Sequence, residues 1–250
     1  MTGPRGCVAV GIDPAGHWHL PLAWAADEAQ RRRLPLHLVL AAPLRHGIRH
    51  AEPAAPAREA SDTLDEACGW ARDRQPEPAV SGELTAGSPA AALCRAAQEA
   101  RMVVLGSRHL RRTAEFLSAG STVVPVSAQA GCPVVVVGDA EHISQQPPYL
   151  VVGVDGSPSA GAALAFAFEE ADLRAAALRA VCVGQPPAFS PHDGEAARRA
   201  LLSEATAGLS DTYPDVRVTH EVLTGHPVEE LGRAAEHALA VVVGRRGRGG

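Results

Sequence analysis

The sequence predicts two α/β domains in tandem, each an open parallel sheet with helices on both faces. Two stretches of the chain align with later stretches without a gap. Residues 8–41 align with 150–183, and residues 87–106 align with 225–244. The offset is 142 residues for the first, as from Asp13 to Asp155, and 138 for the second, as from Gly87 to Gly225. Within each copy, short apolar strands alternate with helices, which is the pattern of right-handed crossovers in a parallel sheet.

The first copy is expected to contain five strands. The apolar runs predict strands at 7–12, 36–41, 79–84, 102–105 and 133–137. Helices are expected at 20–33, 58–74 and 89–100, and a further helix before the last strand. Residues 42–57 are rich in Pro, His and Ala, so they are expected to form a surface loop.

The second copy repeats this order but stops early. It is expected to continue, after its second strand, with a helix at 194–209, a strand at 216–223, a helix at 227–237 and a strand at 239–243. Gly244 is followed by six residues, whereas Gly106 is followed by 32 residues up to Gly138. The second copy therefore lacks a last helix and a last strand, and its strand at 239–243 would be a bare apolar edge. We expect a shortened or incomplete sequence, with domains at 1–140 and 149–250 and a polar linker at 141–148.

Composition excludes several classes of function. A net charge of −5 gives no general attraction to nucleic acid or to anionic membranes, so neither is expected as a partner. All 23 basic residues are Arg, which excludes a Walker A loop and a Schiff-base enzyme, because both need Lys. The five Cys are scattered and indicate reduced thiols rather than disulfides or a metal site. No leader peptide or membrane span is recognisable, so the protein is expected in the cytoplasm.

Two sets of residues are expected at the carboxyl ends of the strands, where open α/β sheets bind ligands. One is the acid that closes the first strand of each copy, Asp13 or Asp155. The other is the loop that begins with Gly106 or Gly244, where a glycine lets backbone amides approach an anion. Together they favour a mononucleotide lying across the strand ends. An equally weighted alternative is that the glycines only turn the chain and the acids only cap helices.

The residues GVDGSPSAGAALAFAFEEA, then G-x-P before a helix, then VVVGRRGRGG resemble the universal stress protein family in its tandem, actinobacterial form. The resemblance covers nearly the whole chain and implies Rossmann-like sheets of strand order 3-2-1-4-5, in which the fifth strand commonly mediates pairing of units. Nucleotide-binding members bind ATP and carry G-x2-G-x9-G-[S/T] after the fourth strand. Other members lack this motif, and the family implies no catalytic reaction.

Carried over residue by residue, the motif is defective in the first copy. The matching positions there are Asp13, Gly106, Gly120 and Ser121. The second glycine of the motif falls on His109, and ten residues, instead of nine, separate His109 from Gly120. Pro125 lies in the opening turns of the following helix, where it removes a backbone donor.

The second copy is defective in a different way. It keeps Asp155, Gly244 and Gly247, and Val183 ends its second strand, where the resemblance places the adenine face. The chain ends before a closing Gly-Ser. Losing one or two charge-assisted phosphate contacts would weaken binding by roughly ten- to several-thousand-fold, which leaves millimolar binding of ATP at best.

We therefore expect a regulatory, adenine-nucleotide-binding scaffold with an impaired ATP site and no metal. It is not expected to be an enzyme, although weak hydrolysis of ATP is left open. The alternative is a ligand-free structural or partner-binding module. In either case the two domains are expected to pair within the chain or in a homodimer.

Overall fold

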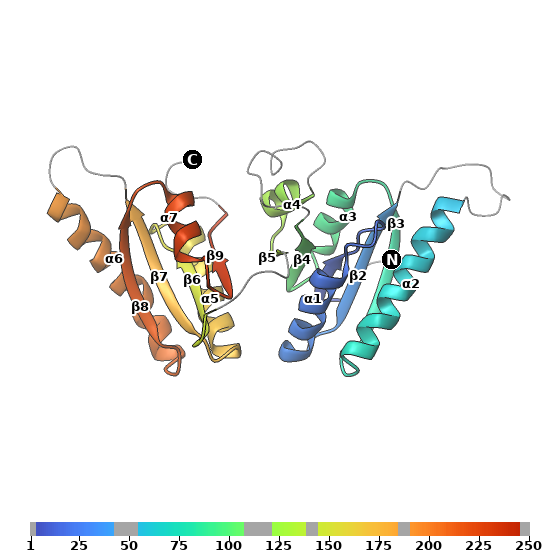
Figure 1. The fold of residues 1–250 in the computed structure, drawn as a ribbon, viewed down its shortest axis with the longest axis horizontal. Helices are drawn as coiled ribbons and strands as arrows, with labels where there is room; N and C mark the ends of the chain where they lie inside the picture. The colour runs from blue at the N-terminus through green and yellow to red at the C-terminus, as the bar shows by residue number, and fades with distance from the viewer. Residues whose placement is uncertain (1–3, 43–54, 108–121, 139–144, 185–190, 246–250) are drawn as a thin grey trace. The chain divides into compact units, whose positions relative to one another are not determined.

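The computed structural model describes residues 4–42, 55–107, 122–138, 145–184 and 191–245. The chain divides into two compact units, Met1–Glu141 and His142–Gly250, each built around one sheet (Figure 1). Among the described residues, no helix is both long enough and apolar enough to cross a membrane.

Unit 1 contains a five-stranded parallel sheet of order β3-β2-β1-β4-β5. Its strands are β1 (Val8–Gly11), β2 (Leu36–Ala42), β3 (Val80–Ala86), β4 (Met102–Gly106) and β5 (Val134–Val137). Its helices are α1 (His19–Arg32), α2 (Ala55–Arg74), α3 (Pro89–Ala96) and α4 (Val123–Gln129). The predicted fold class and the strand order are confirmed.

The central strands of unit 1 are buried on both faces because helices pack on each side. Helices α1 and α2 pack together on one face, and α3 and α4 pack together on the other (Figure 1). On the second face, Val103 and Leu105 of β4 contact a cluster that includes Leu93 of α3 and Val126 of α4. Continuous runs of Val and Leu are the expected strand composition in such a doubly covered parallel sheet.

Two local predictions in unit 1 need correction. The predicted loop at 42–57 is wrong at both ends, because Ala42 belongs to β2 and α2 begins at Ala55. Pro56 does not prevent this start, since a proline in the first helical turn gives up an amide that has no intrahelical partner. Helix α3 ends at Ala96 rather than residue 100, because the amides of residues 97–100 form short turns before β4.

The described part of unit 2 repeats the first four strands of unit 1, in a parallel sheet of order β8-β7-β6-β9. Its elements are β6 (Tyr149–Gly153), α5 (Pro158–Leu173), β7 (Ala177–Gly184), α6 (Pro191–Thr212), β8 (Val218–Thr224), α7 (Pro227–Ala234) and β9 (Ala240–Val242). Helix α6 is longer at both ends than predicted. The described part of unit 2 thus forms a four-stranded parallel sheet, as the sequence predicts.

Strand β9 is the edge of the described sheet, and its side chains on the α7 face are exposed, whereas Val242 packs half-buried on the other face. Helices α5 and α6 cover one face, while α7 packs on the other, next to β6 and β7. On the α7 face, Val241 and Val243 are 47% and 57% exposed. Their counterparts in unit 1, Val103 and Leu105, are 0% and 4% exposed beneath α3 and α4.

The second half of the predicted linker is attached to unit 2. The amide of Gln145 donates to the carbonyl of His237 at 2.9 Å, and the carbonyl of Pro148 accepts from the amide of Ala177 at 3.0 Å. Residues 139–144 lie outside the described residues.

Candidate functional site

In unit 2, Asp155 turns the chain from β6 into α5. Its Oδ1 accepts a hydrogen bond from the amide of Ser157 at 2.9 Å. Ser157 is the N-cap of α5, and its Oγ accepts from the amide of Ala160 at 3.2 Å. Ser157 therefore caps the helix, while Asp155 shapes the turn before it. Oδ1 of Asp155 thus has a structural role.

Gly244, two residues after the end of β9, packs against the first turn of α5. A Cβ at Gly244 would lie 2.7 Å from the carbonyl carbon of Ser159 and 2.8 Å from its carbonyl oxygen and its Oγ. No side chain fits there, so the glycine is required for close backbone approach. The hydroxyls of Ser159 and Ser157 are 3.2 Å apart. The structure thus brings Asp155, two serine hydroxyls and Gly244 together at the carboxyl edge of the sheet.

The equivalent edge of unit 1 lacks these hydroxyls. Asp13 Oδ1 accepts from the amide of Ala15 at 3.0 Å, and its Oδ2 lies 3.8 Å from Nδ1 of His17. A Cβ at Gly106 would lie 3.2 Å from Cγ of Pro21 and 3.7 Å from the carbonyl oxygen of His17. Gly106 is therefore packed against the ring of Pro21, while His17 stands at the position that Ser159 has in unit 2.

The guanidinium of Arg198, from α6, also reaches the carboxyl edge of sheet β8-β7-β6-β9. It lies against Gly184, the last residue of β7. Cys182, two residues earlier on this strand, is buried, and burial raises the pKa of its thiol. The charge of Arg198 lowers that pKa and the charge of Asp155 raises it, so both charges act at the same end of β7. Sequence reasoning missed Arg198.

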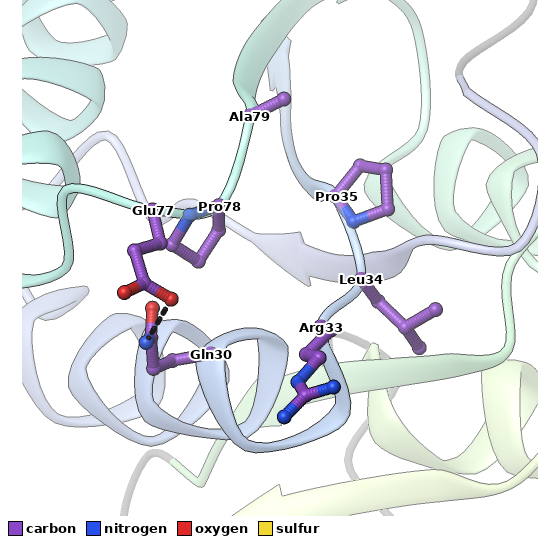
Figure 2. A pocket seen from close by; sticks show the side chains of 7 residues that line it. All are labelled: Gln30, Arg33, Leu34, Pro35, Glu77, Pro78 and Ala79. Atoms are coloured by element: carbon purple, nitrogen blue, oxygen red, sulfur yellow. Dashed lines mark hydrogen bonds between the residues drawn. The ribbon is translucent and has the colours of Figure 1, made fainter.

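A separate cavity of about 370 Å³ lies at the opposite edge of unit 1, between the end of α1 and the start of β3 (Figure 2). It is lined by Gln30, Arg33, Leu34, Pro35, Glu77, Pro78 and Ala79. Nε2 of Gln30 donates to Oε2 of Glu77 at 2.7 Å across it. None of the predicted site residues lines this cavity.

The family model described as the universal stress protein family matches residues 7–138 and 149–250. The chain belongs to the universal stress protein family. It is 33% identical to a universal stress protein of Mycolicibacterium smegmatis, over 97% of this chain and 88% of that protein. It is 31% identical to a universal stress protein of Mycobacterium tuberculosis, over 97% of this chain and 87% of that protein.

A solved universal stress protein of Archaeoglobus fulgidus has the same fold. The two structures superpose with a TM-score of 0.72 over 99% of this chain and 88% of that chain, at 15% sequence identity. At this identity the likeness concerns the fold alone. It supports two sheet-containing units of the universal stress type.

Of the other predicted site residues of this universal stress protein, the structure describes Val183. Gly120, Ser121 and Gly247 lie outside the described residues. Val183 packs, half-buried, with Val181 of the cluster beneath α7. Its side chain thus has a core contact, and an adenine face at Val183 stays a prediction.

Metal binding has no support in the described part of the chain. There, no three side chains of His, Cys, Asp or Glu come close enough together to hold a metal ion. The carboxylate of Asp155 can instead accept hydrogen bonds from a polar organic ligand, and serine hydroxyls can both donate and accept them.

Proposed function

We propose that this universal stress protein is a regulatory binding protein that holds an adenine nucleotide, weakly, in unit 2. The observation that carries the proposal is the contact of Gly244 with Ser159. This contact sets Gly244 beside the N-terminus of α5, next to Asp155. Glycine loops and helix N-termini at the carboxyl edge of a parallel sheet are favourable for phosphate.

The order of the strands suggests how a nucleotide would lie. Strand β6 runs between β7 and β9, so Asp155 lies between Gly244 and Gly184 along the edge. Phosphates would lie near Gly244 and the first turn of α5, where backbone amides and the hydroxyl of Ser159 are close. A ribose hydroxyl would donate to the carboxylate of Asp155. The base would then extend over the end of β7.

We propose weak binding because the described residues of unit 2 supply one side of a phosphate cradle, Gly244 and the first turn of α5. Each lost charge-assisted contact costs about 1.5–3 kcal/mol, so a dissociation constant for ATP in the millimolar range is expected. Binding in unit 1 is expected to be weaker still, since His17 stands at the position of Ser159 and the ring of Pro21 lies against Gly106.

The proposal is tested by amide chemical shifts of the ¹⁵N-labelled chain during titration with ATP. We expect shifts at Gly156 and Gly244 with a millimolar dissociation constant. Asp155→Asn keeps the acceptor for the Ser157 amide but removes the charge, so it should weaken binding about ten-fold. Asp13→Asn is the matched control in unit 1 and should leave the titration unchanged. Micromolar binding, or shifts that are lost with Asp13→Asn instead, would contradict the proposal.

Three further statements remain proposals. The protein is proposed to act by binding and not by turnover, to work in the cytoplasm, and to pair either through its two units or as a homodimer. Light scattering after size-exclusion chromatography, at a low and a high chain concentration, distinguishes a monomer with internal pairing from a homodimer.

A further inference from the structure

The space over the end of β7 is occupied by an arginine side chain. A Cβ built on Gly184 would lie 2.0 Å from Cζ of Arg198 and 2.2 Å from its Nε and Nη2. A Cβ on Gly194, in the first turns of α6, would lie 3.4 Å from Nη1 of the same guanidinium. The guanidinium therefore rests directly on the backbone of β7, and a side chain at Gly184 would displace it.

In unit 1 the end of the equivalent strand has a methyl group. Ala42 is the counterpart of Gly184, because the amide of Gly87 donates to its carbonyl at 3.3 Å as the amide of Gly225 donates to the carbonyl of Gly184 at 3.0 Å. Ala42 is buried. The chain thus provides an internal comparison in which one copy excludes, and the other admits, a large side chain at this place.

The helix residue that fills the space differs in a complementary way. Arg198 of α6 corresponds to Ala60 of α2, which is buried. The correspondence is fixed by the core leucines four residues further on, Leu64 in α2 and Leu202 in α6. Unit 1 has alanine at both positions, whereas unit 2 has glycine and arginine. The two changes depend on each other, since the arginine fits only over a residue without a side chain.

Arg198 has no partner of its own among the side chains that the structure describes. Its neighbour Arg199, by contrast, forms an ion pair with Glu195 at 2.6 Å, and Arg179 forms one with Glu221 at 2.6 Å. A half-buried guanidinium that is held in place, and that forms no ion pair with the described side chains, can contact a ligand.

We propose that Arg198 contacts the base of the nucleotide in unit 2, an inference that rests on the function proposed above. Adjacent strands are about 4.8 Å apart, so the end of β7 lies about 10 Å from the end of β9, on the other side of Asp155. If the phosphates lie at Gly244, the end of β7 is the place for the base. A planar guanidinium stacks well on an aromatic ring, and such a contact strengthens binding by about three- to thirty-fold. The contact with the base would add to the binding free energy that the phosphate contacts at Gly244 provide.

The test compares AMP with adenosine in amide-shift titrations of the full chain. Arg198→Ala should weaken both ligands by the same factor, about three- to thirty-fold, because the base is common to both. Gly184→Ala should weaken both in the same way, since its Cβ displaces the guanidinium. Arg199→Ala is the matched control on the same helix and should leave both titrations unchanged. The amide spectrum of each variant without ligand reports whether it is folded, and Arg198→Ala alone suffices if Gly184→Ala does not fold.

The results that overturn the inference differ from those that overturn the proposed function. Wild-type binding that responds to Asp155→Asn but not to Arg198→Ala overturns the role of Arg198 alone. Tighter binding by Arg198→Ala does so too, because it means that the guanidinium blocks the site. A loss confined to AMP assigns Arg198 to the phosphate and overturns the base contact. A wild-type chain that binds neither ligand overturns both proposals.

Discussion

The two copies of the fold provide a matched pair of substitutions on the fourth strand of each sheet, Val103→Ala and Val241→Ala. Val103 is fully buried and Val241 is 47% exposed. Each substitution removes two methyl groups, worth about 0.8 kcal/mol each when buried, and a closed core adds a cavity cost. We expect Val103→Ala to lower the free energy of unfolding of unit 1 by about 2–3 kcal/mol. Val241→Ala should lower that of unit 2 by less than about 1 kcal/mol, because half of the side chain is already in water.

The aromatic residues allow each unit to be followed separately. All three tryptophans, Trp18, Trp24 and Trp70, are in unit 1, and both tyrosines, Tyr149 and Tyr213, are in unit 2. Tryptophan fluorescence during urea unfolding therefore reports on unit 1, and tyrosine absorbance or far-ultraviolet circular dichroism adds unit 2. The strand propensities of Val and Ala do not cancel in the comparison, because β4 is a central strand and β9 is an edge strand, but their contribution stays within about 1 kcal/mol.

Equal losses for the two substitutions would refute this reasoning. They would mean that Val241 is covered as completely as Val103 in solution. A loss at Val103 below about 1 kcal/mol would instead refute the packing of β4 beneath α3 and α4.

Three further predictions concern unit 1. Burial lowers the pKa of His37 below its usual 6.5, so the unfolded chain takes up the proton first as the pH falls. The stability of unit 1 should therefore fall as the pH drops through about 6.5, and His37→Gln should reduce this slope in urea unfolding. Glu28→Gln breaks the buried ion pair with Arg32 and should cost about 3 kcal/mol or more in the tryptophan-monitored transition; a cost below about 1 kcal/mol would contradict the burial of the pair. Burial raises the pKa of the Cys7 thiol to about 11, so peptide mapping after native alkylation should find Cys7 unlabelled when half-buried Cys94 is labelled.

Much of the fold could be predicted because its signals are local. Apolar runs such as Val8–Gly11 and Met102–Gly106 are strands in the structure at nearly the predicted bounds. The start of α2 shows the limit of such signals, because the helix begins at Ala55 and was predicted to begin at residue 58. A segment rich in Pro and Ala is compatible with both a loop and a first helical turn.

The candidate site could be predicted only in part. The sequence indicated that Asp155 and Gly244 follow strands that end at one edge, and it left open whether the acid binds a ligand or only shapes a turn. The structure shows that Asp155 shapes the turn into α5 and that Ser157 is the cap. It also adds Ser159, whose backbone and hydroxyl pack on Gly244.

The sequence by itself determined the duplication, the parallel α/β class and the four strands described in unit 2, because constant offsets and the periodicity of strands and helices can be recognised along the chain. Only the tertiary structure decided that Arg198 rests on Gly184 and that Ser159 packs on Gly244. Such contacts depend on how a helix crosses a strand and on which elements cover a face. These are properties of three-dimensional packing, to which no single stretch of sequence corresponds.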